Sequence, residues 1–108
     1  MAISSDMLRG HTDTIILRFL DEQDSYGYEI NKHIRDVSDK TFELSEATMY
    51  TAFRRLEKDG LIESYWGNEN SGARRRYYRI TEKGKDAYQA RLKEWDESKK
   101  MIERLIRK

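Results

Sequence analysis

Large apolar residues recur at helical spacing in the first third of the chain. One stripe predicts a first helix over residues 6–22, and a second stripe, at i, i+4 and i+7, predicts a second helix over residues 26–37. The polar run 21–25 separates the two helices. The apolar positions that define them are Ile15, Ile16, Phe19 and Leu20, then Ile30, Ile34 and Val37.

A third helix is predicted between Ser45 and Gly60. Ser45 is a favourable N-cap because its hydroxyl can accept a hydrogen bond from a backbone N–H of the first turn. Gly60 suits the position after the last turn because glycine adopts positive φ without strain. The side of this helix that would pack on the first two helices carries Met49, Ala52, Phe53 and Leu56.

After Gly60 the period of the apolar residues changes from that of a helix to that of a strand. Residues 61–66 and 74–80 predict two strands, and the turn-rich segment 67–72 joins them into a hairpin. Alternation along the second strand places two residues on the core side, namely Tyr78 and Ile80.

A last helix begins at Thr81 and meets no helix breaker after Gly84. We therefore expect an α+β chain that is mainly α. Residues 1–80 would form a winged helix-turn-helix DNA-binding domain, and residues 81–108 would form a long C-terminal dimerisation helix.

Apolar residues of the last helix follow a heptad rhythm, which is typical of a helix packed along another helix. The helix extends beyond any core that the preceding residues could supply, and a second copy of the chain is the economical partner. We expect a homodimer in which this helix also packs with the first helix of the partner. Lys99 is the one polar member of the stripe. The expected dimer interface is Tyr88, Leu92, Trp95, Met101, Ile102, Leu105 and Ile106.

The outward side of the third helix suits the major groove of DNA. Small residues lie near its N-terminus, followed by hydroxyls and cations, and no carboxylate lies on this side before Asp59. Arginine can hydrogen-bond guanine with two N–H groups, and hydroxyls reach phosphates or base edges. The alternative is an ordinary solvated helix face. The outward residues are Ala47, Thr51, Arg54 and Lys58, flanked by Thr48, Tyr50 and Arg55.

Four arginines lie within residues 74–79, in a chain whose net charge is only +1. Those nearest the loop can reach phosphates, and each such contact adds salt-dependent affinity. The alternative is a charged edge strand that prevents aggregation. Together the helix and the hairpin favour double-stranded DNA as the partner. The expected DNA-binding residues are Ser45, Thr48, Tyr50, Thr51, Arg54, Arg55, Lys58, Arg74, Arg75 and Arg76.

Composition argues against an enzyme. The chain has no cysteine, and His11 and His33 have no partner at metal-ligand spacing, so we expect no metal, no cofactor and no catalytic residue. The longest apolar run, 15–17, is too short to span a membrane, and the N-terminus does not resemble a signal peptide. We expect a cytoplasmic protein with no membrane partner. A winged helix that dimerises for protein interaction, without binding DNA, is the remaining alternative.

Five short segments along nearly the whole chain resemble one family. They are LRG at 8–10, YGYEI at 26–30, EATMYT at 46–51, RLEKDGLI at 55–62 and RYYRITEKG at 76–84. Together they resemble the PadR family of bacterial transcriptional regulators. The resemblance implies a repressor of an efflux or stress gene, which binds an inverted-repeat operator and loses DNA affinity when an effector binds. It also implies that Tyr50 binds a phosphate and that residues 74–76 are the wing tip. Ala47 and Thr51 replace the family's commoner glycine and proline, which we expect to change the bases that are read.

The single terminal helix and the short length resemble the multidrug-sensing subgroup of that family, of the lactococcal type. In this subgroup the last and first helices of two subunits enclose a flat apolar pore, where paired tryptophans stack on planar ligands. Trp95 matches that tryptophan, so the resemblance implies a planar aromatic effector. The alternative is that Trp95 only fills the dimer seam. The implied ligand-binding residues are Met7, Thr14, Ile15, Arg18, Trp95, Ser98, Lys99 and Ile102.

Overall fold

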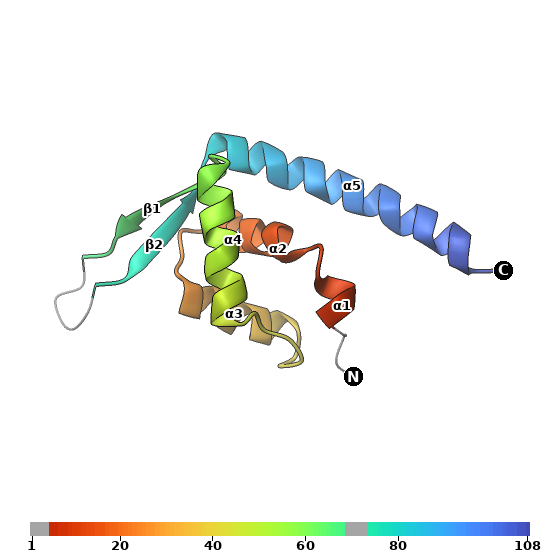
Figure 1. The fold of residues 1–108 in the computed structure, drawn as a ribbon, viewed down its shortest axis with the longest axis horizontal. Coiled ribbons are helices and arrows are strands. Elements are labelled where there is room, and N and C mark those ends of the chain that lie inside the picture. The colour runs from red at the N-terminus through yellow and green to blue at the C-terminus, as the bar shows by residue number, and fades with distance from the viewer. Residues whose placement is uncertain (1–4, 69–73) are drawn as a thin grey trace.

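The computed structural model describes residues 5–68 and 74–108, whose arrangement is shown in Figure 1. Within this part of the chain, short helices are followed by an antiparallel hairpin and a long last helix. The elements are α1 (Ser5–Leu8), α2 (Thr12–Glu22), α3 (Gly27–Val37), α4 (Glu46–Lys58), β1 (Ile62–Trp66), β2 (Arg76–Ile80) and α5 (Glu82–Ile106). The predicted class, a mainly helical winged helix-turn-helix with a long C-terminal helix, is confirmed. Turn residues 69–72 of the predicted loop lie outside the described residues.

The prediction of a single first helix over residues 6–22 is wrong, because the chain is not helical between α1 and α2. The chain turns there, with the N–H of His11 donating to the carbonyl of Leu8 at 2.9 Å. The carbonyl of His11 then accepts the N–H of Ile15 at 2.9 Å and starts α2. Gly10 lies inside this turn, and a glycine costs about 1 kcal/mol relative to alanine in a helix interior.

The core lies between α2, α3, α4 and the hairpin. The inward residues predicted for α4, namely Met49, Ala52, Phe53 and Leu56, are all buried. Val37, which the apolar period placed in the stripe of the second helix, is instead exposed. The buried apolar residues are Ile16, Leu17, Phe19, Leu20, Ile30, Ile34, Leu44, Met49, Ala52, Phe53, Leu56, Leu61, Ile62, Tyr78 and Ile80.

The hairpin pairs β1 with β2 in antiparallel register, with Ile62 opposite Ile80 and Ser64 opposite Tyr78. Tyr78 and Ile80 face the core, as the alternation predicted. A bridge from Ser25 extends the pairing, since its N–H donates to the carbonyl of Tyr78 at 3.2 Å and its carbonyl accepts the N–H of Tyr78 at 2.8 Å. The segment between α2 and α3 therefore anchors the hairpin to the helical body.

Thr81 caps the last helix, α5, which begins at Glu82; the Thr81 hydroxyl accepts the N–H of Gly84 at 3.0 Å. Gly84 touches the hairpin so closely that a Cβ at this position would lie 2.0 Å from the carbonyl oxygen of Leu61. Because that contact is with backbone, only glycine allows α5 to leave the hairpin at this angle.

Beyond its first turns, α5 passes beside α2 and then projects past the helical body (Figure 1). Its 25 residues span about 37 Å at the usual helical rise. In the part of the chain that the structure describes, no helix is both long and apolar enough to span a lipid bilayer.

Candidate nucleic-acid interface

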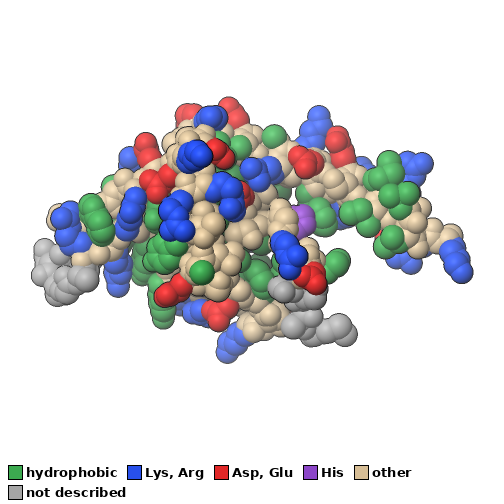
Figure 2. Space-filling view, in the orientation of Figure 1, with side chains coloured by type: hydrophobic (Ala, Val, Ile, Leu, Met, Phe, Trp, Pro, Cys, Tyr) green, Lys and Arg blue, Asp and Glu red, His purple; other side chains and the backbone are tan. Residues whose placement is uncertain are grey.

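Helix α4 turns its predicted outward side to solvent. Ser45 caps it as predicted, its Oγ accepting the N–H of Thr48 at 3.1 Å. Basic side chains lie over α4 and along the hairpin in Figure 2, which shares the orientation of Figure 1. The exposed residues of α4 include Ala47, Thr48, Tyr50, Thr51, Arg54, Arg55 and Lys58.

Thr51 and Arg54 form a polar pair at the centre of this surface. Nη2 of Arg54 donates to Oγ1 of Thr51 at 3.3 Å, which directs the guanidinium along the helix surface. Tyr50 is about half exposed at 47% and its ring meets that of Phe53 edge-on. The Tyr50 hydroxyl lies close to Gly27 at the start of α3, where no side chain caps the helix. The hydroxyl of Tyr50 on α4 and the uncapped N-terminal turn of α3 therefore lie at one edge of this surface.

Arg55 is held at one flank of α4 by a carboxylate from α2. Its Nε donates to Oδ2 of Asp13 at 2.9 Å, and its Nη2 pairs with Oδ1 of the same side chain. The hydrogen bond with Asp13 and the negative charges of Asp13 and Asp59 raise the pKa of Arg55, so the guanidinium is fully charged. The side chain of Asp13 itself is largely buried.

The arginines of the hairpin do not share one environment. Arg76 turns towards α4, where it donates to Oγ of Ser64 at 2.9 Å and pairs with Glu57 at 3.4 Å. The guanidinium of Arg74 lies 5.8 Å from the ring of Trp66. Arg75 is exposed, on the other side of the strand, with its guanidinium over the ring of Tyr26 at 4.8 Å. The three arginines expected to bind DNA, Arg74, Arg75 and Arg76, thus point to more than one side of the hairpin and do not form one continuous basic row.

Aromatic rings stiffen the hairpin on the side away from α4. Tyr77 stacks on Tyr65 with centroids 5.6 Å apart and meets Tyr26 edge-on. The hydroxyl of Tyr65 donates to Oδ2 of Asp24 at 2.6 Å, and this hydrogen bond raises the pKa of Tyr65. Arg79 pairs with Glu63, so this arginine neutralises a strand carboxylate. A hairpin held in this way presents the residues near its tip in a defined orientation.

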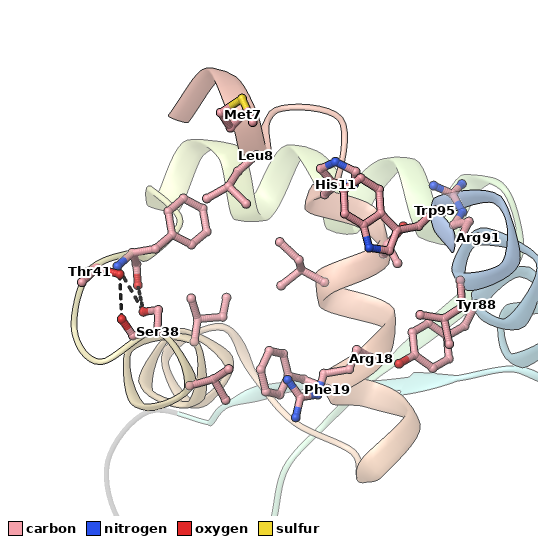
Figure 3. Close-up of a pocket in the computed structure, with 16 residues that line it drawn as sticks. Met7, Leu8, His11, Arg18, Phe19, Ser38, Thr41, Tyr88, Arg91 and Trp95 are labelled. Carbon is pink, nitrogen blue, oxygen red and sulfur yellow. Dashed lines mark hydrogen bonds between the residues drawn. The ribbon is translucent and has the colours of Figure 1, made fainter. Parts of the chain in front are cut away.

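A separate apolar groove of about 520 Å³ lies between α5 and the helices α1, α2 and α3 (Figure 3). Five of the predicted ligand-binding residues line it, and Trp95 meets the ring of His11 edge-on at 4.9 Å. Lys99 lies over the Trp95 ring at 5.8 Å without lining the groove. Ser98 and Ile102 are also further along α5, outside the groove. The predicted residues that line it are Met7, Thr14, Ile15, Arg18 and Trp95.

Sequence reasoning missed the wall that α3 and the following segment contribute to this groove. Val37 belongs to that wall, but the apolar period had assigned it to the core stripe of the second helix, and only the structure shows it exposed. Phe42 also lines the groove, but a linear pattern does not show that residues 38–42 return beside α1. The lining residues that were not anticipated include His11, Phe19, Ile34, Val37, Phe42 and Arg91.

The predicted dimer residues divide into two groups. Tyr88, Leu92 and Trp95 line the groove of their own chain; the first two are half-buried and Trp95 is 40% exposed. The second group lies on the free end of α5, where Figure 2 shows a cluster of apolar side chains at the right. This exposed group is Met101, Ile102, Leu105 and Ile106, with exposures of 49%, 48%, 76% and 73%.

A capped, outward-facing helix beside an arginine-bearing hairpin defines a winged-helix protein of the DNA-binding type. Residues 16–90 match the family model described as the transcriptional regulator PadR-like family. The chain belongs to this family, whose members are DNA-binding transcriptional regulators and not enzymes. Among the described residues, no three His, Asp or Glu side chains gather as a metal site.

Similar proteins match the chain over almost its whole length. A transcriptional regulator from Clostridium thermocellum is 50% identical, with a TM-score of 0.88, over 98% of this chain and 100% of that one. A PadR family regulator from Clostridium difficile R20291 is 40% identical, with a TM-score of 0.77, over 89% and 98%. An uncharacterised protein from Lysinibacillus sphaericus is 46% identical over 94% of this chain and 93% of its own.

Proposed function

We propose that this chain is a cytoplasmic, homodimeric repressor that binds an inverted-repeat operator and is released by a planar apolar effector. The observation that carries the proposal is the outward surface of α4. Its exposed hydroxyls and cations stand beside the arginine-bearing end of the hairpin, on a helix whose opposite side is locked into the core.

Helix α4 and the hairpin would have different roles in DNA recognition. Helix α4 would enter the major groove, where Thr51 and Arg54 would reach base edges, while Ser45, Thr48 and Lys58 would lie nearer the backbone. Arg74 and Arg75, at the end of the hairpin, would contact phosphates and add salt-dependent affinity. Arg76 would contribute less, because it is already paired with Glu57. Tyr50, exposed beside the start of α3, would bind a phosphate, which is the role that the family resemblance implies.

Dimerisation would follow from the exposed apolar end of α5. Four large apolar side chains beyond the helical body have no core of their own to enter, and a second copy supplies a matching surface. Regulators of this family typically dimerise. Two copies of α4 in such a dimer would read half-sites about one DNA turn apart, roughly 34–36 Å.

The effector would bind at the groove beside Trp95. The groove is mainly apolar, and a tryptophan and a histidine ring stand at its edge, which suits a flat aromatic molecule. Arg18 is paired with Glu22 at 2.8 Å, so its charge does not oppose a cationic ligand strongly. Ser98, Lys99 and Ile102 would join the site only in the dimer. An efflux or stress gene is the target that fits such a ligand.

The test is a salt titration of binding to two duplexes, one of random sequence and one selected from a randomised pool. We expect both to weaken steeply as salt rises, because bound phosphates release counterions. The selected duplex should contain an inverted repeat and bind more tightly at every salt concentration. A protein that binds neither duplex at low salt would instead support a protein-interaction role and overturn the proposal.

A further inference from the structure

Asp13 is a largely buried carboxylate close to the surface that we expect to face DNA. Its side chain is 13% exposed and lies in the first turn of α2, where the helix dipole stabilises a negative charge. A carboxylate near DNA is repelled by phosphates, so its presence beside the basic residues of α4 needs a physical reason. Arg55, 42 residues away in the chain, is the partner that supplies one.

The geometry of the pair leaves one edge of the guanidinium available. Nε and Nη2 of Arg55 engage the two carboxylate oxygens of Asp13, so the planar group is fixed in a bidentate arrangement. Nη1 makes no hydrogen bond to any other residue within 5–68 and 74–108. The Arg55 side chain as a whole is still 47% exposed. Its orientation is therefore set by Asp13 while donors remain for a further acceptor.

Arg55 also lies on a particular flank of α4. The opposite flank is tied to the hairpin, because Glu57 accepts from Oγ of Ser64 at 3.1 Å and pairs with Arg76. The flank with Arg55 is tied to α2 instead. A helix whose outward side enters the major groove brings its two flanks to the two phosphate backbones that border the groove. The free edge of Arg55 is thus placed for the backbone opposite the hairpin.

We infer that Asp13 is a positioning residue, which holds the Arg55 guanidinium so that its free Nη1 edge binds a DNA phosphate at the flank of α4 away from the hairpin. This inference rests on the proposed DNA-binding function. It assigns Asp13, an acidic residue outside the DNA-facing helix, to the DNA interface. Phosphate contacts fix the register of a protein on its site without reading sequence, so Asp13 sets how α4 enters the groove.

The direction in which one substitution changes DNA affinity distinguishes a positioning role from a simple effect of charge. Removing a carboxylate near DNA ordinarily strengthens binding, because it removes repulsion. If Asp13 positions Arg55, Asp13→Asn weakens binding instead. We expect about a fivefold loss on a random duplex. The negative slope of log K against log salt should also become shallower by about 0.9, as for one lost phosphate contact. Arg55→Gln should give the same loss, and the double variant should be no weaker than either single one.

Glu46→Gln is the matched control, because Glu46 is an exposed carboxylate on α4, the helix of Arg55, and makes no hydrogen bond or ion pair with the described residues. It should strengthen binding slightly. If Asp13→Asn strengthens binding as Glu46→Gln does, Asp13 acts only as a nearby charge and the inference is overturned. A wild-type protein that does not bind the random duplex at low salt contradicts the proposed function itself, which is a different outcome.

A second variant covers the case in which Asp13→Asn fails to fold. Arg55→Lys keeps the positive charge but cannot engage both carboxylate oxygens and still present a fixed edge. With its fold checked by circular dichroism, this variant should lose about as much affinity as Arg55→Gln. Full wild-type affinity for Arg55→Lys would mean that charge alone suffices, and would overturn the positioning role.

Discussion

The ring of Phe53 on α4 stacks on the ring of Tyr78 on β2, with centroids 3.9 Å apart and planes inclined by 18°. Both rings are buried, and burial raises the pKa of the Tyr78 hydroxyl. The contact joins the helix expected to enter the groove to the hairpin expected to follow the backbone. It therefore sets the separation of the two elements, and a stacked aromatic pair contributes about 0.5–1.5 kcal/mol beyond its buried area.

Phe53→Ala should lower the free energy of unfolding by about 3–5 kcal/mol, because it leaves a cavity at this junction. Phe53→Leu should cost less, since part of the volume remains. Denaturant unfolding followed by circular dichroism measures both. Tyr50→Ala is the control, because the Tyr50 ring also meets Phe53 but is half exposed. An equal loss for Tyr50→Ala would contradict the importance given to the buried stack.

Two glycines give opposite predictions for the same substitution. Gly84→Ala would place a methyl group 2.0 Å from the Leu61 carbonyl oxygen, so α5 must shift away from the hairpin. We expect a loss of stability of about 3 kcal/mol, the upper end of overpacking costs. Gly10→Ala meets nothing within 4 Å and should stabilise the chain by about 0.4–1 kcal/mol. Melting temperatures that fell equally for the two variants would refute this account of Gly84.

The fold was predictable because its elements are local patterns. The cap at Ser45, the positive φ of Gly60 and the alternation ending at Ile80 all appear where the sequence indicated. The break before α2 was not predicted, because residues 9–14 contain no proline and only Gly10 signals the turn. Periodicity describes what a segment prefers, whereas the path of the chain around a core depends on packing.

The interface was only partly predictable, because ion pairs join residues that are distant in the chain. The sequence pattern of α4 identified Arg55 as a flanking position, but its partner, Asp13, comes from another element. Arg76, which pairs with Glu57 of the same helix, also comes from another element. The arginine run at 74–79 looked uniform in sequence. In the structure each guanidinium meets a different neighbour, and this decides which of them remains available to DNA.

Arg54→Ala should weaken binding to the operator more than binding to random DNA. A guanidinium that reads a base pair contributes about 1–3 kcal/mol of discrimination, which is lost with the side chain, while backbone contacts persist. Parallel titrations with a selected duplex and a random duplex measure the difference. Lys83→Ala is a control, because Lys83 lies on α5 and donates to the Asp59 carbonyl at 2.8 Å. Equal weakening on both duplexes by Arg54→Ala would show that Arg54 contacts only the backbone.

Leu105→Glu combined with Ile106→Glu should convert the protein to a monomer. These side chains lie on the free end of α5, so the substitutions leave the helical core untouched while introducing charge into the proposed interface. Sedimentation equilibrium measures the mass, and DNA binding should weaken because a monomer reaches one half-site only. Arg104→Glu changes charge on the other side of the same helix and should leave the dimer intact. A double variant that stays dimeric would place the interface elsewhere.

A planar aromatic ligand should quench the fluorescence of Trp95 when it enters the groove. The chain has two tryptophans, so the Trp66→Phe background makes Trp95 the only reporter. Stacking on an indole contributes about 1 kcal/mol or more, so Trp95→Ala should lower the affinity for an acridine dye about tenfold, as measured by calorimetry. Lys100→Ala, an exposed change on the same helix, should leave that affinity unaltered. If Trp95→Ala bound the dye as tightly as the parent, Trp95 would serve packing alone, and the effector site would have to lie outside the groove.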